Sequence, residues 1–291
     1  MKIGLGTVQF GMDYGVSNAA GKVLAPEVSK ILDLAKQQSI SILDTASSYG
    51  NSEEVLGSVL ADDRSFSIVT KTPVFKNEII TKSEVTELNN AFAASLKKLQ
   101  QPSVYGLLVH SSEDLLKHGG DLLWEKMCNL KEQGLVKKIG VSVYTAEQID
   151  RISDKYSIDL IQVSINVFDQ RLLLSGHLSK LKKTNIEIHA RSIFLQGVLL
   201  SKVTDLPSYF KPFHSHLQRY YEFVYKHNWS PVQASLGFAL GIEEIDTVLL
   251  GVESEAQLRE IINTAKSLDS SLFRRFAMDD DLLLNPSKWQ L

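Results

Sequence analysis

The stretch Leu43-Asp44-Thr45-Ala46-Ser47-Ser48-Tyr49-Gly50 ends a short apolar run and places an acid and a phenol directly after it. Two stretches downstream repeat this arrangement, since Thr70-Lys71 and Val109-His110 also follow short apolar runs. Runs of this length, bounded by polar residues, are typical of buried β-strands. If the three runs are neighbouring parallel strands, four titratable side chains converge on one rim: Asp44, Tyr49, Lys71 and His110.

The chain has 291 residues, of which 44% are hydrophobic and 22% charged, as in an ordinary globular protein. A formal net charge of -3 gives no basic surface for nucleic acid. Cys128 is the only cysteine, which excludes a disulfide framework and a thiol-rich metal site. The sequence opens without an apolar signal region and contains no apolar run long enough to span a membrane. We therefore expect a cytoplasmic protein without nucleic-acid or membrane partners, either a monomer or a weak homo-oligomer.

Short apolar strands alternate with amphipathic helices along nearly the whole chain. The predicted strands cover residues 3–7, 40–45, 66–71, 104–110, 137–143, 158–164, 186–192 and 246–251. Between and after them, helices are predicted at 26–38, from 51, and at 81–99, 114–133, 145–153, 176–183, 213–227, 231–240 and 255–267. Thr81-x-x-Glu84 and Thr145-x-x-Gln148 match the capping box that opens a helix.

Eight strand–helix units favour a (β/α)8 TIM barrel, with residues 1–291 forming a single domain. A doubly wound open sheet would normally carry a glycine-rich phosphate turn after its first strand. Gly4-x-Gly6 does not continue that pattern, because Gln9 occupies the last position. Near the other end, Asp279-Asp280-Asp281 is interpreted as a solvated turn rather than a metal site, and Trp289 is expected to pack back on the body.

The four rim residues suit proton delivery to a carbonyl oxygen. A phenol such as Tyr49 donates a proton poorly unless its anion is stabilised, and Lys71 beside it would supply that stabilisation. Asp44 would keep Lys71 charged and oriented, while His110 would donate a hydrogen bond to the substrate oxygen. The reaction also needs a hydride source, because no side chain provides one.

At this point the sequence resembles the aldo-keto reductases. Asp44-Thr45-Ala46-x-x-Tyr49-Gly50, Thr70-Lys71 and Leu108-Val109-His110 are similar to the catalytic tetrad of that family, in the usual order. Gly4-Leu5-Gly6-Thr7 is similar to its first strand and residues 134–142 to its fifth, so the resemblance covers nearly the whole chain. It implies an NAD(P)H-dependent oxidoreductase that reduces an aldehyde or ketone to an alcohol, with Tyr49 as general acid and sugar-derived carbonyl compounds among the candidate substrates.

The resemblance also implies a set of cofactor contacts. Ser142 and Gln162 would hold the nicotinamide carboxamide, and Arg191 stands where the family commonly has the tyrosine that stacks on the ring. The remaining implied contacts are Gly6, Thr7, Asp44, Ser192, Phe194, Gln196, Gly197, Gly251, Gln257 and Glu260.

The two nicotinamide cofactors are distinguished at the adenosine end of the site. The family commonly places a cation after the last strand, where it binds the 2′-phosphate of NADP, but Gly251-Val252-Glu253 places a carboxylate there. The resemblance favours NADP(H), and the charge of Glu253 favours NAD(H). We expect NADP(H) by a small margin, on condition that Arg259 or Lys202 reaches the phosphate.

Other functions remain open on the same residues. The fold could serve a regulatory protein that senses nicotinamide nucleotide, a redox-assisted sugar epimerase, or an aldolase in which Lys71 forms a Schiff base. Phe10, Tyr14, Phe75 and Phe168 follow strand ends and are candidates for the substrate pocket, although such aromatics equally often pack in the core. Residues 195–212 are a candidate lid.

Overall fold

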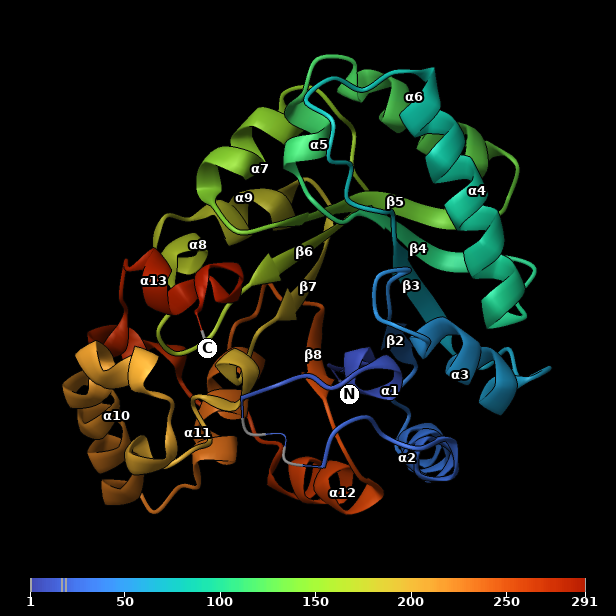
Figure 1. Ribbon diagram of the computed structural model, residues 1–291. Helices are drawn as coiled ribbons and strands as arrows, with labels where there is room; N and C mark the ends of the chain where they lie inside the picture. Colours follow the sequence, from blue (N-terminus) through green and yellow to red (C-terminus); the bar gives the residue numbers. More distant parts are fainter. Residues whose placement is uncertain (1, 17, 19, 291) are drawn as a thin grey trace.

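Eight parallel strands close into a barrel in the computed structural model, in the order in which they occur in the chain (Figure 1). The strands are β1 (Ile3–Gly6), β2 (Ile42–Asp44), β3 (Ser67–Lys71), β4 (Val104–Val109), β5 (Val136–Val143), β6 (Leu160–Ser164), β7 (Glu187–Arg191) and β8 (Thr247–Gly251). The predicted TIM barrel is confirmed. The structure describes residues 2–16, 18 and 20–290, so Met1 and Leu291, the ends of the predicted domain, lie outside it.

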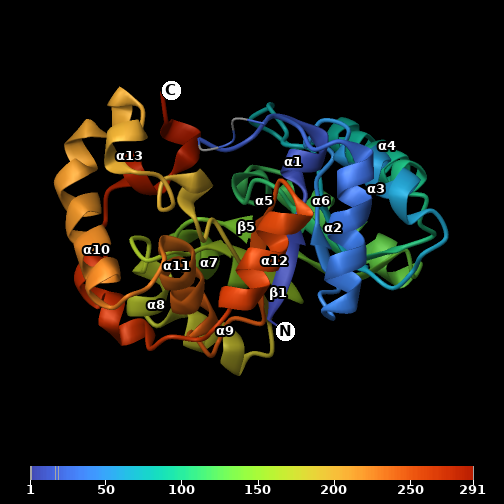
Figure 2. The same cartoon turned by 90° about the horizontal axis from the view of Figure 1, so that it is seen from below.

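Helices surround the barrel on all sides (Figures 1 and 2). The α-helices are α1 (Val8–Gly11), α2 (Ala25–Gln37), α3 (Ser52–Leu60), α4 (Lys82–Leu99), α5 (Glu113–Leu116), α6 (Gly120–Glu132), α7 (Ala146–Ser153), α8 (Arg171–Leu174), α9 (His177–Lys183), α10 (His214–Lys226), α11 (Pro231–Leu240), α12 (Glu255–Thr264) and α13 (Asp281–Leu284). Short 3-10 helices are η1 (Leu195–Gly197), η2 (Val203–Asp205), η3 (Ser208–Phe213), η4 (Ser270–Phe276) and η5 (Pro286–Lys288). None of the helices in the described residues is long and apolar enough to cross a membrane.

Local sequence signals set several of these boundaries. Both predicted capping boxes form: the Thr81 side chain accepts from the Ser83 N–H at the start of α4, and Thr145 accepts from Gln148 at the start of α7. Each such cap contributes about 1 kcal/mol to its helix.

The helix predicted over residues 114–133 is wrong, because the structure divides it into α5 and α6. Gly119 lies between them with a φ of 80°, a left-handed conformation that favours glycine. A Cβ added at Gly120 would come within 2.4 Å of the carbonyl oxygen of Leu115, so the chain turns where only glycine fits.

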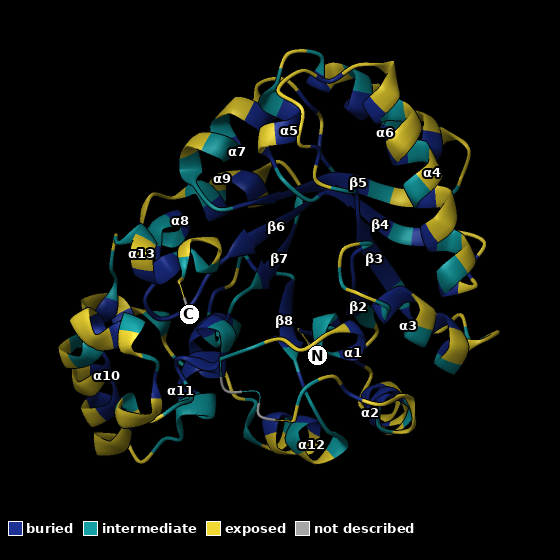
Figure 3. Ribbon diagram, viewed as in Figure 1, coloured by how far each residue is buried: buried dark blue, intermediate teal, exposed yellow. Residues whose placement is uncertain are grey.

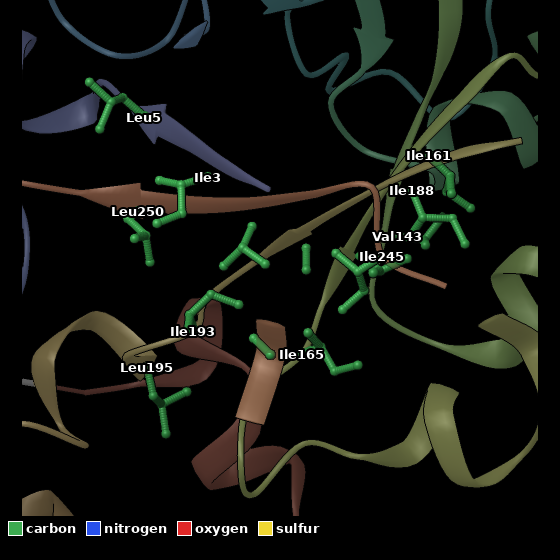
Figure 4. Close-up of a cluster of buried hydrophobic side chains, with 14 of the residues drawn as sticks. Ile3, Leu5, Val143, Ile161, Ile165, Ile188, Ile193, Leu195, Ile245 and Leu250 are labelled. Atoms are coloured by element: carbon green, nitrogen blue, oxygen red, sulfur yellow. The ribbon is translucent and has the colours of Figure 1, made fainter. Parts of the chain in front are cut away.

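The strands bury apolar side chains on both of their faces. Buried residues are concentrated in the strands, while the helices expose their outer faces (Figure 3). The larger cluster lies between strands and helices and includes Ile3, Leu5, Ile188 and Leu250 (Figure 4). Each such side chain stabilises the fold by about 1.5–3 kcal/mol on burial. A separate cluster joins Val69 of β3, Leu108 of β4 and Leu160 of β6, which places it inside the barrel.

Polar side chains fill the barrel interior near the starts of the strands. Glu187 of β7 accepts hydrogen bonds from Tyr105 at 2.6 Å and from Lys138, and its other oxygen lies 2.6 Å from Nε2 of the buried His189. Burial raises the pKa of Glu187, but these partners outweigh it and lower the pKa to about 2. The carboxylate is thereby held charged inside the barrel.

The C-terminal segment returns to the body of the molecule. As predicted, Trp289 packs back: its ring centroid lies 4.9 Å from that of Phe210, and its indole N–H donates to the Leu283 carbonyl. Asp281 pairs with Arg171 and Lys288, while Asp280 accepts from the Leu282 N–H at the start of α13. These acids have structural partners, and the described residues contain no cluster of three or more candidate metal ligands.

Candidate active site

A cavity of about 480 Å³ opens at the ends of the strands where the four tetrad residues were expected. Barrels of this kind carry their active sites at that face. Every residue that the sequence assigned to the tetrad or to the cofactor contacts lines this one cavity. They are Gly6, Thr7, Asp44, Tyr49, Lys71, His110, Ser142, Gln162, Arg191, Ser192, Phe194, Gln196, Gly197, Gly251, Gln257 and Glu260. The structure brings these residues together, and their individual roles remain predictions.

Lys71 and Asp44 form a buried ion pair at the base of the cavity. Lys71 Nζ lies 2.7 Å from Asp44 Oδ2 and also donates to the Thr45 carbonyl at 2.8 Å. The Lys71 side chain is 0% exposed and that of Asp44 is 7% exposed. Burial alone disfavours the ammonium, but Asp44 and Tyr49 outweigh it and raise the pKa of Lys71. The lysine is therefore a fixed positive charge, not a neutral amine.

The Tyr49 hydroxyl lies beside this charge. Lys71 Nζ is 3.4 Å from the hydroxyl oxygen and 4.9 Å from the ring centroid. Since the ammonium has donors left over from Asp44 and Thr45, it can stabilise a phenolate formed at Tyr49. This is the electrostatic support that a tyrosine proton donor requires.

The loop that carries Tyr49 is fixed by close backbone packing and a buried hydroxyl network. A Cβ added at Gly11 would lie 1.8 Å from the Tyr49 carbonyl oxygen, so this contact requires glycine. Thr7 Oγ1 donates to the Asp44 carbonyl at 3.0 Å, and Ser52 Oγ donates to the Thr7 carbonyl at 2.8 Å. These bonds tie the ends of β1 and β2 together and hold the tyrosine in place.

Gln162 reaches Asp44 from the far side of the barrel. Its amide Nε2 donates to Asp44 Oδ1 at 2.7 Å, so both carboxylate oxygens have a donor. The sequence assigned Gln162 to the nicotinamide carboxamide, and the contact with Asp44 is additional to that assignment. The amide oxygen of Gln162 remains free of this bond and can accept from a ligand.

His110 is neutral over the physiological pH range. Burial disfavours the imidazolium, and repulsion from Lys71 adds to this effect, so the pKa of His110 falls to about 4. Its Nδ1 lies 3.4 Å from Ser48 Oγ, and its ring packs edge-on against Tyr49 with centroids 6.1 Å apart. A neutral imidazole can donate one hydrogen bond to a substrate oxygen without carrying charge itself.

Arg191 occupies the cavity wall at the end of β7. Its guanidinium lies 4.2 Å from the ring centroid of Tyr144 and donates to Ser142 Oγ, Ser192 Oγ and the Val143 carbonyl. The contact with Tyr144 orients the guanidinium plane, as cation–π packing does elsewhere. This placement was not predicted, although Tyr144 follows the fifth strand just as Tyr49 follows the second.

A backbone hydrogen bond joins two loops that line the cavity. The Val16 N–H, in the loop after β1, donates to the Gln196 carbonyl, in the loop after β7, at 2.8 Å. Ser192, Leu195 and Gln196 have φ values of 64°, 47° and 52°, conformations that non-glycine residues rarely adopt. Strain of this kind costs on the order of 1 kcal/mol per residue and clusters at ligand-binding sites. The bond and the strained turn fix the backbone along this wall of the cavity.

The aromatic candidates for the pocket separate into two groups. Tyr14 lines the cavity. Phe10, Phe75 and Phe168 are instead buried in the core, where Phe168 packs edge-on against Tyr220 of α10. Cavity residues that the sequence did not assign to a ligand include Gln9, Tyr144, Val232, Pro286 and Ser287. Gln9 follows the first strand and could have been found from that position. Pro286 and Ser287 follow no strand, so the pattern of strands gave no reason to place them at the site.

The model of the aldo/keto reductase family matches residues 2–277. The chain is 25% identical over 158 residues to methylglyoxal reductase DkgA of Escherichia coli K12, covering 54% of each protein. It is 27% identical over 179 residues to aldo-keto reductase YhdN of Bacillus subtilis, covering 59% of this chain and 53% of the relative. The chain thus spans about half the length of the curated relatives it matches.

A solved structure matches over a longer range. The holo form of aldo-keto reductase AKR11C1 from Bacillus halodurans aligns with a TM-score of 0.77 over 99% of this chain and 95% of that one, at 18% identity. This likeness concerns the fold. With the family model covering nearly all of the chain, the conclusion is that this protein belongs to the aldo/keto reductase family.

Proposed function

We propose that this protein is an NAD(P)H-dependent oxidoreductase that reduces an aldehyde or ketone to an alcohol, with Tyr49 as the proton donor. One observation carries the proposal: the buried Lys71 ammonium lies 2.7 Å from Asp44 and 3.4 Å from the Tyr49 hydroxyl. A small carbonyl compound is the expected substrate. Family membership and relatives named as reductases support the same chemistry.

The residues present fit a nicotinamide nucleotide. Gln9 Oε1 is buried and has no hydrogen-bond partner among the described residues, so it is an acceptor available to a ligand. The strained turn at Ser192, Leu195 and Gln196 lies along the same cavity. When bound there, the reduced nicotinamide would supply a hydride to the carbonyl carbon. Ser142 and Gln162 are proposed to hold its carboxamide.

The side chains then account for the proton. As the carbonyl oxygen gains negative charge, Tyr49 donates its hydroxyl proton to that oxygen and becomes a phenolate. Lys71 stabilises the phenolate, and Asp44 keeps the lysine charged. His110, neutral at working pH, donates a hydrogen bond to the same oxygen and shares the charge that develops in the transition state. The products are the alcohol and the oxidised nucleotide.

The alternatives differ in what they require of Lys71. A Schiff-base aldolase needs a neutral lysine amine as nucleophile, whereas Asp44 and Tyr49 raise the pKa of Lys71 despite its burial. A nucleotide-sensing protein would not need a proton donor, and a redox-assisted epimerase would retain its nucleotide through each turnover. These readings stay as alternatives with less support from the geometry.

Removing the hydroxyl oxygen of Tyr49 tests the proposal. Tyr49→Phe should abolish the reduction of a simple aldehyde while nucleotide binding, followed by fluorescence titration, stays within about threefold of the wild-type value. Unchanged turnover in this variant would refute Tyr49 as the acid. Borohydride trapping with substrate should leave Lys71 unmodified, and a trapped adduct would favour the aldolase.

A further inference from the structure

The cavity has two chemically different ends. Tyr49, Lys71 and Arg191 lie at one end, and the C-terminal end of β8 and the start of α12 form the other. At this second end the charged side chains that line the cavity are Glu253 and Glu260, and no lysine or arginine of the described residues lines it. If the proposed function holds, the nicotinamide lies at Tyr49 and the adenosine half of the nucleotide extends toward these carboxylates.

We infer that this protein prefers NADH to NADPH, with Glu253 as the residue that sets the preference. The inference rests on the proposed function and concerns the choice between its two candidate nucleotides. They differ only at the adenosine ribose, where NADH has a 2′-hydroxyl and NADPH has a phosphate with a charge of about -1.5 to -2 at pH 7. A carboxylate accepts a hydrogen bond from the hydroxyl and repels the phosphate.

The helix start near this site does not restore a place for phosphate. The N-terminus of a helix ordinarily attracts anions through its free N–H groups. In α12 the Glu255 N–H donates to the Glu27 carboxylate at 2.9 Å, and the Gln257 N–H donates to Ser254 Oγ at 3.1 Å. An acid of the protein, Glu27, thus already occupies the helix start, and its other oxygen pairs with Lys30 at 3.0 Å.

Glu253 itself has a fixed backbone. Its N–H donates to the side-chain oxygen of Gln257 at 2.7 Å, and Ser254, the next residue, caps α12. The side chain is half-buried, and burial raises the pKa of its carboxyl group. No ion pair joins Glu253 to a lysine or arginine within the described part of the chain. Glu253 therefore lines this end of the cavity without an ion-pair partner among the described residues.

The cations that could have rescued phosphate binding lie elsewhere. Arg259 forms an ion pair with Glu255 on the exposed face of α12, and it does not line the cavity. Lys202 is exposed in the segment before η2 and does not line the cavity either. The condition under which the sequence favoured NADP(H) is not met in this structure.

Separate titrations of the full-length protein with NADH and NADPH test the inference, with quenching of protein fluorescence as the readout. We expect NADH to bind at least tenfold more tightly at low ionic strength. Glu253→Gln should bring the affinities for NADH and NADPH closer together, because it removes the negative charge at residue 253. Glu253→Arg should reverse the preference, because it places a positive charge there. Glu87→Gln, an exposed carboxylate on α4, is the matched control and should leave the ratio unchanged.

The outcomes separate this inference from the proposed function. Equal or tighter binding of NADPH by the wild-type protein would overturn the NADH preference and leave carbonyl reduction standing. The same preference in wild type and Glu253→Arg would show that Glu253 does not set it. If neither nucleotide binds at millimolar concentration, the proposed function fails and the inference fails with it.

Discussion

Removing the buried ion pair beneath Tyr49 should disable proton transfer while the barrel stays folded. Lys71→Met alone would leave Asp44 charged and unpaired in a dry site, at a cost of about 3–5 kcal/mol in stability. The informative variant is therefore the double substitution Asp44→Asn with Lys71→Met. The asparagine retains an oxygen that can accept the hydrogen bond from Gln162, so the contact across the barrel is preserved.

The distance between Lys71 and Tyr49 sets the expected loss. At 3.4 Å, with an effective dielectric constant of about 20, the ammonium and a developing phenolate attract each other by about 5 kcal/mol. Since the charge on the phenolate is only partly developed in the transition state, a loss of about 4 kcal/mol, or roughly a thousandfold in rate, is expected. Nucleotide affinity should change far less.

The assay is single-turnover oxidation of the bound reduced nucleotide by a simple aldehyde, followed by the nicotinamide absorbance. Asp159→Asn with Lys131→Met serves as the control, because it removes an ion pair of similar length, 2.6 Å, on the outside of the barrel. Circular dichroism and nucleotide titration establish that each variant is folded. A loss smaller than tenfold in a folded, nucleotide-binding double variant would refute the role assigned to Lys71.

Three further predictions concern protonation and packing. Because the pKa of His110 is about 4, the rate should show no inflection from this residue between pH 5 and 8; an inflection near pH 6.5 that vanishes in His110→Ala would contradict this. Glu187 has its pKa lowered from 4.5 to about 2, so it contributes about 3 kcal/mol of stability above pH 4.5 that is lost as the pH falls toward 2. Urea unfolding of Glu187→Gln should show this loss of stability at pH 7 and a weaker dependence of the unfolding free energy on pH below 4.5. If the variant has the same pH dependence as the wild type, the role assigned to Glu187 is refuted. Gly140→Ala would bring a Cβ within 1.6 Å of the Leu160 carbonyl oxygen and should prevent stable folding, whereas Gly134→Ala, with φ of 73° and open space, should cost only about 1–2 kcal/mol in a thermal melt.

The barrel and the convergence of the tetrad residues on one cavity could be predicted because both depend on the order of residues along the chain. Asp44 and Lys71 end adjacent strands, and His110 directly follows the next strand. Parallel pairing then brings all three to one face whatever the details of packing. The placement of Tyr49 depends on one further feature, the close contact between its carbonyl oxygen and Gly11. That contact cannot be read from the sequence.

The parts that could not be predicted depend on contacts between distant side chains. Arg191 packs on Tyr144, which is 47 positions earlier in the chain, and neither residue signals the other locally. Phe75 and Phe168 follow strands just as the candidate site residues do, but both are buried in the core, and Phe168 packs against Tyr220 of the distant helix α10. The break between α5 and α6 had a local signal in the pair Gly119-Gly120, whose positive φ and close approach require glycine.

The backbone bond between Val16 and Gln196 has a consequence for the timing of turnover. Gly15 and Gln196 both line the cavity, so the bond links, at the cavity wall, two loops that are far apart in the sequence. If the proposed nucleotide binds behind this bond, its release would require the two loops to separate, and loop motions of this kind take microseconds to milliseconds in enzymes. Departure of the spent nucleotide, rather than the transfer of hydride and proton, would then set the pace of each catalytic cycle.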